Sequence, residues 1–320
     1  MDTNKLDRSI RELNRRIKSI KEASQRAGNN DLFENVVSLE ERTRKFEEDY
    51  YHAMDRWKRI ELSRLEMRPQ TLDYISLAFD DFIELKGDRL FRDDTAVIGG
   101  LATFRGRKVV VVGNQKGRGL KARLFRNFGM PHPEGYRKAV RLMELAEKFN
   151  LPLVTMIDTP GAFPGVEAEM RGQSIAIAQS MAVMVALKVP IVAIVIGEGG
   201  SGGALALGVA NRVFMMENAS YSVVSPEACA SILWKDRKMK KSAAEALKST
   251  AQDNLALGLI DEIIPEPVGG AHRDHGATAK SLGDSLEKCL EEIGNIPLDT
   301  LLTERYERTR RMGIYHEITR

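Results

Sequence analysis

The sequence predicts an α/β fold preceded by a helical amino-terminal region. From about residue 96, apolar runs alternate with amphipathic stretches, which is typical of strands covered by helices on both faces. Two of the apolar runs end in glycine-rich segments, "DTPGAFPG" and "GEGGSGG". Near the start, apolar residues instead recur at helical spacing among many charges. We therefore expect a helical region over residues 1–68, a main domain over 69–296 and a helical tail over 297–320.

The composition is that of a soluble protein with a sizeable core. The 320 residues are 43% hydrophobic and 29% charged, and the formal charge of +3 argues against binding of a nucleic acid by the molecule as a whole. Cys229 and Cys289 are far apart and form no CxxC pair, so neither a zinc site nor a disulfide framework is indicated. The charged start shows no secretory signal, and no apolar run is long enough for a membrane helix. We expect a cytoplasmic protein.

The amino-terminal region is predicted to form a helical hairpin. Residues 5–26 carry apolar side chains at helical spacing, and "RAGNND" then breaks the pattern. Residues 31–66 form a second charged stretch, predicted as one helix of about 35 residues and about 50 Å. Because acidic and basic residues are interspersed, we expect the hairpin to pack on the main domain or on a partner rather than on nucleic acid.

The main domain is predicted to begin at Pro69 with a helix capped by Thr71 and running to about Leu85. Two strands follow in "AVIGGLATFRGRKVVVVGNQ", joined at a turn of Arg105 and Gly106. The next predicted elements are, in order, a helix in "GYRKAVRLMELAEKFN", a strand in "LPLVTMID", a helix in "EMRGQSIAIAQSMAVMVALK" and a strand in "VPIVAIVI".

After the second glycine segment come a short Ala/Leu helix, strands in "RVFMME" and "YSVVS", and a helix that begins at Pro226. A further helix is predicted near 277–294, and "RYERTRR" is expected to be a solvated helix end. We expect Cys229 to be a buried structural thiol. Met215 and Trp234 are expected in the core.

The stretch "IVIGEGGSGGALALG" fits three motifs. Gly197, Gly199 and Gly202 match the dinucleotide pattern G-x-G-x-x-G. Gly199, Ser201 and Gly203 match the nucleophile elbow G-x-S-x-G. The stretch also suits a loop whose backbone amides hold a negatively charged oxygen, since glycine lets such an oxygen approach closely.

The dinucleotide interpretation gains support from Glu217, which lies where a ribose-binding acid belongs. Against it, only residues Gly203–Asn211 remain for a helix between parallel strands, which is short for such a crossover. The hydrolase interpretation needs an acid and then a histidine after the serine, and Asp261 and His272 come in that order. No second sequence signal brings those two residues together.

The third interpretation uses no side chain. The first amides of a helix have no intrahelical partner, and the helix dipole makes that end electropositive. Gly202 and Gly203 open the predicted Ala/Leu helix, so their amides are the best candidates, with Gly199 and Gly200 as supporting backbone. A glycine-requiring tight turn without a ligand is the remaining alternative.

Five ordered blocks carry a resemblance to a known family: "RNFGMPHPEGYRKAVRLMELAEKF", "IDTPGAFPGVEAEMRGQS", "IGEGGSGGALALG", "SVVSPEACASILWKD" and "IDEIIPEPVGGAHRD". Together they resemble the alpha subunit of the bacterial acetyl-CoA carboxylase carboxyltransferase, from about residue 5 to 312. The resemblance implies a crotonase-like fold (ClpP/crotonase superfold) of repeated β-β-α units. It also implies transfer of a carboxyl group from carboxybiotin to acetyl-CoA, giving malonyl-CoA for fatty acid synthesis, or the reaction of a related biotin-dependent acyl-CoA carboxylase or decarboxylase.

The resemblance also implies partners. The biotin belongs to a separate carrier protein, a beta subunit with a zinc ribbon completes an alpha2beta2 assembly, and biotin carboxylase is the subunit that uses ATP. The chain has neither the four-cysteine ribbon nor a GxxxxGK[ST] motif, so we expect no metal and no ATP site in it.

The family's pattern assigns the ureido oxygen of biotin to Gly202 and Gly203, and it places Pro160, Gly161 and Ala162 near the biotin site. The basic stretch "QKGRGLKARLFR" is then a candidate contact for CoA phosphates or an acidic carrier face, through Lys116, Arg118, Lys121, Arg123 and Arg126. A solvated basic loop is the alternative.

Overall fold

A computed structural model describes residues 3–313 of the chain. Eight strands of the described chain form one mixed sheet in the order β1-β2-β3-β4-β5-β6-β8, with β7 added beside β5. The first two pairings, β1 with β2 and β2 with β3, are antiparallel, and the others are parallel. The strands are β1 (Asp80–Glu84), β2 (Val97–Phe104), β3 (Arg107–Asn114), β4 (Leu153–Thr159), β5 (Ile191–Gly200), β6 (Arg212–Met216), β7 (Ser220–Ser222) and β8 (Glu262–Ile264).

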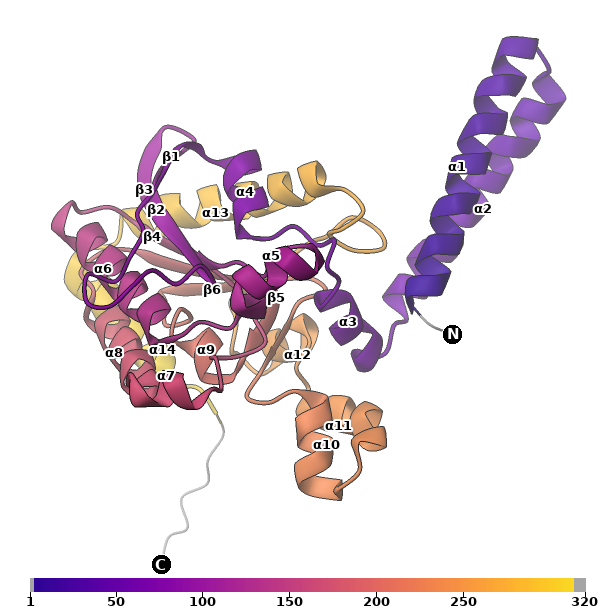
Figure 1. Cartoon of the computed structure of the whole chain (residues 1–320). Helices are drawn as coiled ribbons and strands as arrows, with labels where there is room; N and C mark the ends of the chain where they lie inside the picture. The colour runs from indigo at the N-terminus through magenta and orange to yellow at the C-terminus, as the bar shows by residue number, and fades with distance from the viewer. Residues whose placement is uncertain (1–2, 314–320) are drawn as a thin grey trace, which may run out of the picture.

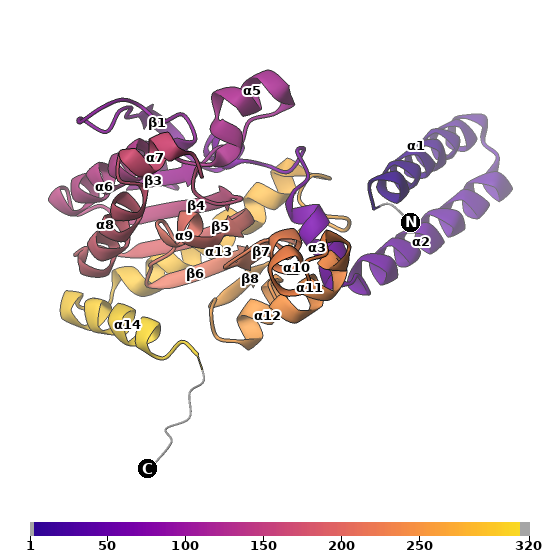
Figure 2. The ribbon, with the colours of Figure 1, turned by 60° about the horizontal axis from the view of Figure 1, so that its bottom comes forward.

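Helices cover both faces of this sheet (Figure 2). On one side α6, α8 and α9 pack together, with α6 against β2 and β3 and α9 against β4 and β5. On the other side lies α13, and α4 packs against it. The helices are α1 (Thr3–Ala27), α2 (Asn30–His52), α3 (Arg56–Ser63), α4 (Thr71–Ala78), α5 (Gly119–Phe125), α6 (Pro133–Lys148), α7 (Val166–Met170), α8 (Gln173–Ala186), α9 (Ser201–Leu205), α10 (Pro226–Trp234), α11 (Lys240–Leu247), α12 (Ala251–Ala256), α13 (His275–Gly294) and α14 (Leu298–Arg310).

The predicted α/β class is confirmed, and its physical basis is visible in the central strands. All seven residues of β4 are buried, so this strand is covered on both sides, as expected when helices lie on both faces of the sheet. The β-β-α order occurs at β2–β3, followed by α5 and α6, and again at β6–β7–α10. In contrast, β4 and β5 are each followed by a helix without a second strand in between.

The amino-terminal hairpin is confirmed, but its second helix is not continuous. α1 and α2 pack along each other and project away from the rest of the molecule (Figure 1). The helix predicted over 31–66 breaks after His52, and Asp55 caps a separate helix, α3, by accepting a hydrogen bond from the Lys58 amide at 2.8 Å. α3 packs on the main body, where Arg59 donates to Asn218 at 2.9 Å. These contacts attach α3 to the main body.

Two other predicted helices are shorter than expected. The helix predicted from Thr71 to Leu85 ends at Ala78, and Phe79 begins the extended segment that becomes β1 and pairs with β2. Gln70, not Thr71, is its N-cap. The helix predicted in "EMRGQSIAIAQSMAVMVALK" is interrupted at Gly172, whose φ of 81° is left-handed and separates α7 from α8.

The second glycine segment is partly strand. β5 extends through Gly200, where its end pairs with β7, so only residues 201–205 form the short helix α9. The remaining connection leads to β6, which lies parallel to β5. A crossover of residues 201–211 therefore does join two parallel neighbours, and the length argument against a dinucleotide loop was wrong.

The carboxy-terminal helix is not simply a solvated end. Arg305 of α14 is 1% exposed and lies among backbone carbonyls at the end of α8. Cys229 and Met215 are buried, which confirms both expectations, whereas Trp234 is 41% exposed and is not a core residue. In residues 3–313, no helix has both the length and the hydropathy needed to cross a bilayer.

Candidate functional site

The two glycine segments meet at the carboxyl ends of β4 and β5. A Cβ added to Gly200 would lie 2.2 Å from the carbonyl oxygen of Pro160. A Cβ added to Gly203 would lie 2.6 Å from the Ala162 nitrogen and 2.6 Å from the Gly161 carbonyl carbon. Backbone therefore packs directly on backbone here, and only glycine leaves room for it. The structure brings together five of the residues singled out from the sequence.

The short helix α9 begins directly at the end of β5. Ser201 adopts a left-handed φ of 50°, and Gly202 and Gly203 are the second and third residues of α9. Amides in the first turn of a helix have no intrahelical acceptor, so they are available to an outside oxygen. A Cβ on Gly202 would make only ordinary contact, 3.6 Å from Ile177, so a side chain at this position causes no clash. Gly199 has a different role, because its Cβ would lie 2.6 Å from the ring of Tyr221.

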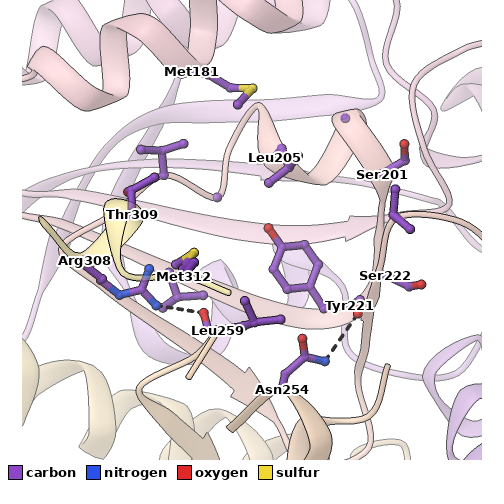
Figure 3. A pocket seen from close by; sticks show the side chains of 15 residues that line it. Met181, Ser201, Leu205, Tyr221, Ser222, Asn254, Leu259, Arg308, Thr309 and Met312 are labelled. Atoms are coloured by element: carbon purple, nitrogen blue, oxygen red, sulfur yellow. Dashed lines mark hydrogen bonds between the residues drawn. The ribbon is translucent and has the colours of Figure 1, made fainter. Parts of the chain in front are cut away.

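An apolar pocket of about 320 Å³ opens beside Gly202 (Figure 3). Tyr221 of β7 stands in its middle, and its backbone carbonyl accepts a hydrogen bond from Asn254 at 3.3 Å. Arg308 closes one side by donating to the carbonyl of Leu259 at 2.8 Å. The other lining residues come mainly from α8, α9, the strands β6 and β7, and the end of α14: Met181, Ser201, Leu205, Gly208, Val209, Val213, Ser222, Val223, Thr309 and Met312.

Each glycine segment carries one carboxylate, and both carboxylates are paired with cations. Lys116 Nζ is 2.7 Å from Asp158 Oδ1 and 2.7 Å from Glu198 Oε2. Arg64, which follows α3, reaches the same Glu198 at 2.7 Å and Glu227 of α10 at 2.7 Å. Burial alone would lower the pKa of Lys116, but the two carboxylates outweigh it and raise that pKa. Burial alone would raise the pKa of Glu198, yet Lys116 and Arg64 lower it, so the lysine and this glutamate are held in their charged forms.

The basic stretch divides into paired and exposed cations. Arg118 bonds both carboxylate oxygens of Asp73, at 2.6 and 3.1 Å, and also the carbonyl of Arg68 at 2.8 Å. Lys116 is paired with Asp158 and Glu198. These pairings argue against the expectation that Lys116 and Arg118 bind CoA phosphates, because carboxylates of the chain already neutralise them. Lys121 and Arg123 are exposed on α5, where Arg123 has only a distant carboxylate partner, Glu66 at 4.0 Å, so these two cations fit that expectation better.

The residues invoked by the competing motifs have structural partners. Asp261 accepts from the Val213 amide at 2.6 Å and pairs with Arg308 at 3.1 Å, which ties α14 to the edge of the sheet. Glu217 accepts from the Glu266 amide at 3.1 Å. Gly197 is required for packing, since its Cβ would lie 2.3 Å from Asp158 Oδ1. These contacts give neither a catalytic acid nor a ribose-binding acid at the site.

Sequence reasoning assigned no role to Arg64, Asp158 or Glu198. The signal for two of them was present, because each places a carboxylate at the end of an otherwise apolar strand. Arg64 gave no comparable signal, because it lies in a charged stretch far from the glycine segments in sequence.

Two solved structures share the fold of this chain. A transcarboxylase 12S structure with hydrolysed methylmalonyl-coenzyme A bound superposes with a TM-score of 0.59 at 20% identity, over 73% of this chain and 43% of that one. A Pseudomonas malonate decarboxylase hetero-dimer gives a TM-score of 0.53 at 19% identity, over 68% of this chain and 89% of the other. The chain therefore shares the mixed α/β fold of these two structures, and this fold defines its structural class.

Sequence relatives define the family within that class. The family model "Acetyl co-enzyme A carboxylase carboxyltransferase-like" matches residues 3–313. The acetyl-coenzyme A carboxylase carboxyl transferase subunit alpha of a Thermus thermophilus strain is 53% identical over 97% of this chain and 98% of its own length. That of Listeria monocytogenes serovar 1/2a is 50% identical over 98% of both. The chain belongs to the family of acetyl-CoA carboxylase carboxyltransferase alpha subunits, which serve fatty acid synthesis.

Proposed function

We propose that this chain handles the carboxybiotin half of the transfer of a carboxyl group to acetyl-CoA, which yields malonyl-CoA. The observation that carries the proposal is the start of α9, where Gly202 and Gly203 present first-turn amides beside an open pocket. The close packing of Gly200 and Gly203 on the backbone of residues 160–162 holds the start of α9 in place. We assign catalysis to the two amides and not to a side chain.

The chemistry suits such amides. When the bond between the carboxyl carbon and the biotin nitrogen breaks, negative charge develops on the ureido oxygen, and two backbone donors stabilise it by about 3 kcal/mol each. The ureido anion can then take a proton from the acetyl methyl group, and the resulting enolate attacks the released carboxyl carbon. These reaction steps balance without a protein base. This agrees with the structure, where Asp261, the acid of the hydrolase interpretation, is engaged by the Val213 amide and Arg308.

The proposed reaction requires further proteins beside this chain. We infer a separate carrier protein that brings the biotin, a beta subunit with a zinc ribbon that binds acetyl-CoA and holds the enolate, and an alpha2beta2 arrangement in the cytoplasm. ATP would be used by biotin carboxylase and not by this chain. The family membership as subunit alpha supports a complex of several components.

The test is reconstitution of the chain with its cognate beta subunit. The pair, supplied with carboxybiotin on the carrier protein and acetyl-CoA, is expected to form malonyl-CoA, followed as radiolabel transferred from carboxybiotin. Propionyl-CoA and malonyl-CoA serve as alternative substrates, so that a different acceptor or a decarboxylation would be seen. Absence of transfer to any of these acyl-CoA substrates would rule out the proposal.

A further inference from the structure

The ends of three adjacent parallel strands are joined by one buried cation. Lys116 follows the end of β3, Asp158 is the penultimate residue of β4, and Glu198 lies near the end of β5. Lys116 Nζ is equidistant from the two carboxylates, at 2.7 Å. A further hydrogen bond, from the Glu198 amide to Asp158 Oδ1 at 2.9 Å, closes the triangle. All three side chains are at most 17% exposed.

The two carboxylates belong to the two glycine segments. Asp158 precedes the backbone of Pro160–Ala162, and Glu198 precedes the glycines that lead into α9. Lys116 therefore links the two segments through their carboxylates. Gly129 packs closely on Lys116, because a Cβ at that position would lie 2.5 Å from its Cγ, and this limits the positions open to the lysine side chain.

A second cation reaches the same group from the amino-terminal side of the chain. Arg64, the C-cap of α3, contacts Glu198 and Glu227, so the segment that follows the amino-terminal hairpin contributes to the support of the site. The cluster holds two cations and three carboxylates, and each carboxylate has at least one cation as partner. Charge compensation of this kind is required for ionised groups in a buried place.

We propose that Lys116 is a positioning residue that sets the relative placement of the two glycine segments and, through Glu198, the direction of the Gly202 and Gly203 amides. It acts through Asp158 and Glu198 and does not touch substrate. The inference rests on the proposed function in one respect, namely that those amides are the donors to the reacting oxygen.

Geometry rather than stability is the reason to expect this role. Replacing a whole buried ion pair by apolar side chains is often neutral or stabilising, so the pair as a unit is a weak source of stability, although removing one partner alone leaves an unpaired charge and is destabilising. By contrast, a displacement of about 1 Å at a catalytic centre can cost about 100-fold in rate. Lys116 lies beyond the last pair of the β3–β4 ladder, Gly113 with Met156, so its loss removes the side-chain link between the end of β3 and the two glycine segments.

The experiment compares Lys116→Met with Arg56→Met in the assembled alpha–beta enzyme. Arg56 is a matched control, since it also bridges two carboxylates, Asp253 at 2.6 Å and Glu245 at 2.5 Å. Neither of these carboxylates belongs to a glycine segment. Lys116→Met is expected to lower kcat by about 100-fold while KM for acetyl-CoA changes by less than about 3-fold. Arg56→Met is expected to lower Tm without a comparable loss of kcat.

Hydrogen exchange supplies a readout that does not depend on activity. In Lys116→Met, amides of residues 159–163 and 199–205 are expected to exchange about 10-fold faster, while those of α13 stay unchanged. If Lys116→Met does not fold, Glu198→Gln keeps the side-chain size and is expected to show the same pattern to a smaller degree.

The outcomes separate the two proposals. Faster exchange in both glycine segments of an alpha–beta pair whose wild-type form makes no malonyl-CoA would support the positioning role and sink the proposed function. A wild-type level of exchange in both segments, or an equal fall of kcat in the Arg56 control, would overturn the positioning role and leave the proposed function standing.

Discussion

The glycines of the site differ in what their missing side chains permit. A Cβ added to Gly200 or Gly203 would lie 2.2 or 2.6 Å from backbone atoms, so glycine is needed there for the fold of the site itself. A Cβ added to Gly202 would lie 3.6 Å from Ile177, and this residue has no left-handed φ, so a side chain fits there without disturbing the backbone. A substitution at Gly202 therefore reports on the site, whereas one at Gly203 reports on packing as well.

The first prediction concerns Gly202→Val. The variant is expected to fold and to bind its beta subunit, while kcat falls by roughly 100-fold or more because the valine occupies the space needed by the oxygen. Gly276→Val is a matched control, since Gly276 also lies in the first turn of a helix and its Cβ would make only ordinary contact, 3.4 Å from Asp274. Steady-state kinetics and thermal unfolding of both variants provide the measurement.

A substitution at Ser201 tests the alternative that this serine is a nucleophile. Its exposed hydroxyl lies at the pocket, so a serine nucleophile would make Ser201→Ala inactive. If Ser201→Ala loses turnover while Gly202→Val keeps it, the assignment to backbone amides is wrong.

At the scale of elements, α14 illustrates how a charged helix is anchored. Arg305 donates to the carbonyls of Met184, Leu187 and Val189 at 2.6–2.8 Å, and to Asn211 Oδ1 at 2.7 Å. Burial lowers the pKa of Arg305 to about 10. The guanidinium satisfies carbonyls that the end of α8 leaves open, which is why the helix docks although its sequence is highly charged.

The second prediction follows from this contact. Arg305→Gln is expected to reduce the free energy of unfolding by about 3 kcal/mol, because several buried carbonyls lose their donor. Arg310→Gln, on the exposed side of the same helix, is expected to change it by less than about 0.5 kcal/mol. Urea unfolding followed by circular dichroism measures both values. Equal effects at the two positions would contradict the anchoring role.

At the scale of the whole molecule, ion pairs tie distant parts of the chain to the central sheet. Arg56 links α3 to α12 through Asp253, and Arg68 forms a buried pair with Glu266 at 2.6 Å. The pKa of Glu266 is lowered because Arg68 outweighs the opposite effect of burial. The pKa of Asp253 is also lowered, since burial is outweighed by its hydrogen bonds to Arg56 and Thr250.

The third prediction is the pH dependence of stability. A carboxylate whose pKa is lowered by folding stabilises the protein above its unfolded pKa, 3.8 for Asp253, and loses that effect as pH falls through its folded value. Asp253→Asn is therefore expected to be less stable than the wild type by about 1.5 kcal/mol at neutral pH. The two unfolding curves should converge as pH falls below 3.8. A difference that is constant with pH would contradict the pairing.

Much of this architecture was predictable because its cause is local. Alternating apolar and amphipathic stretches predicted most strands and helices, and the turn at Arg105 and Gly106 was confirmed by left-handed φ values at both residues. Where local signals failed, a tertiary contact or a single backbone conformation decided the outcome. The break after His52 is an example, since capping by Asp55 redirects the chain so that α3 can pack on the body.

The sequence by itself determined the fold class, the family and the two glycine segments, because periodicity, glycine spacing and ordered blocks are properties of neighbouring residues. Only the tertiary structure decided which groups meet. Lys116 was a candidate for a phosphate contact until the fold placed it against Glu198, 82 residues away. Burial and charge pairing depend on contacts between distant segments, so neither the partner of a buried cation nor its role can be read from the residues beside it.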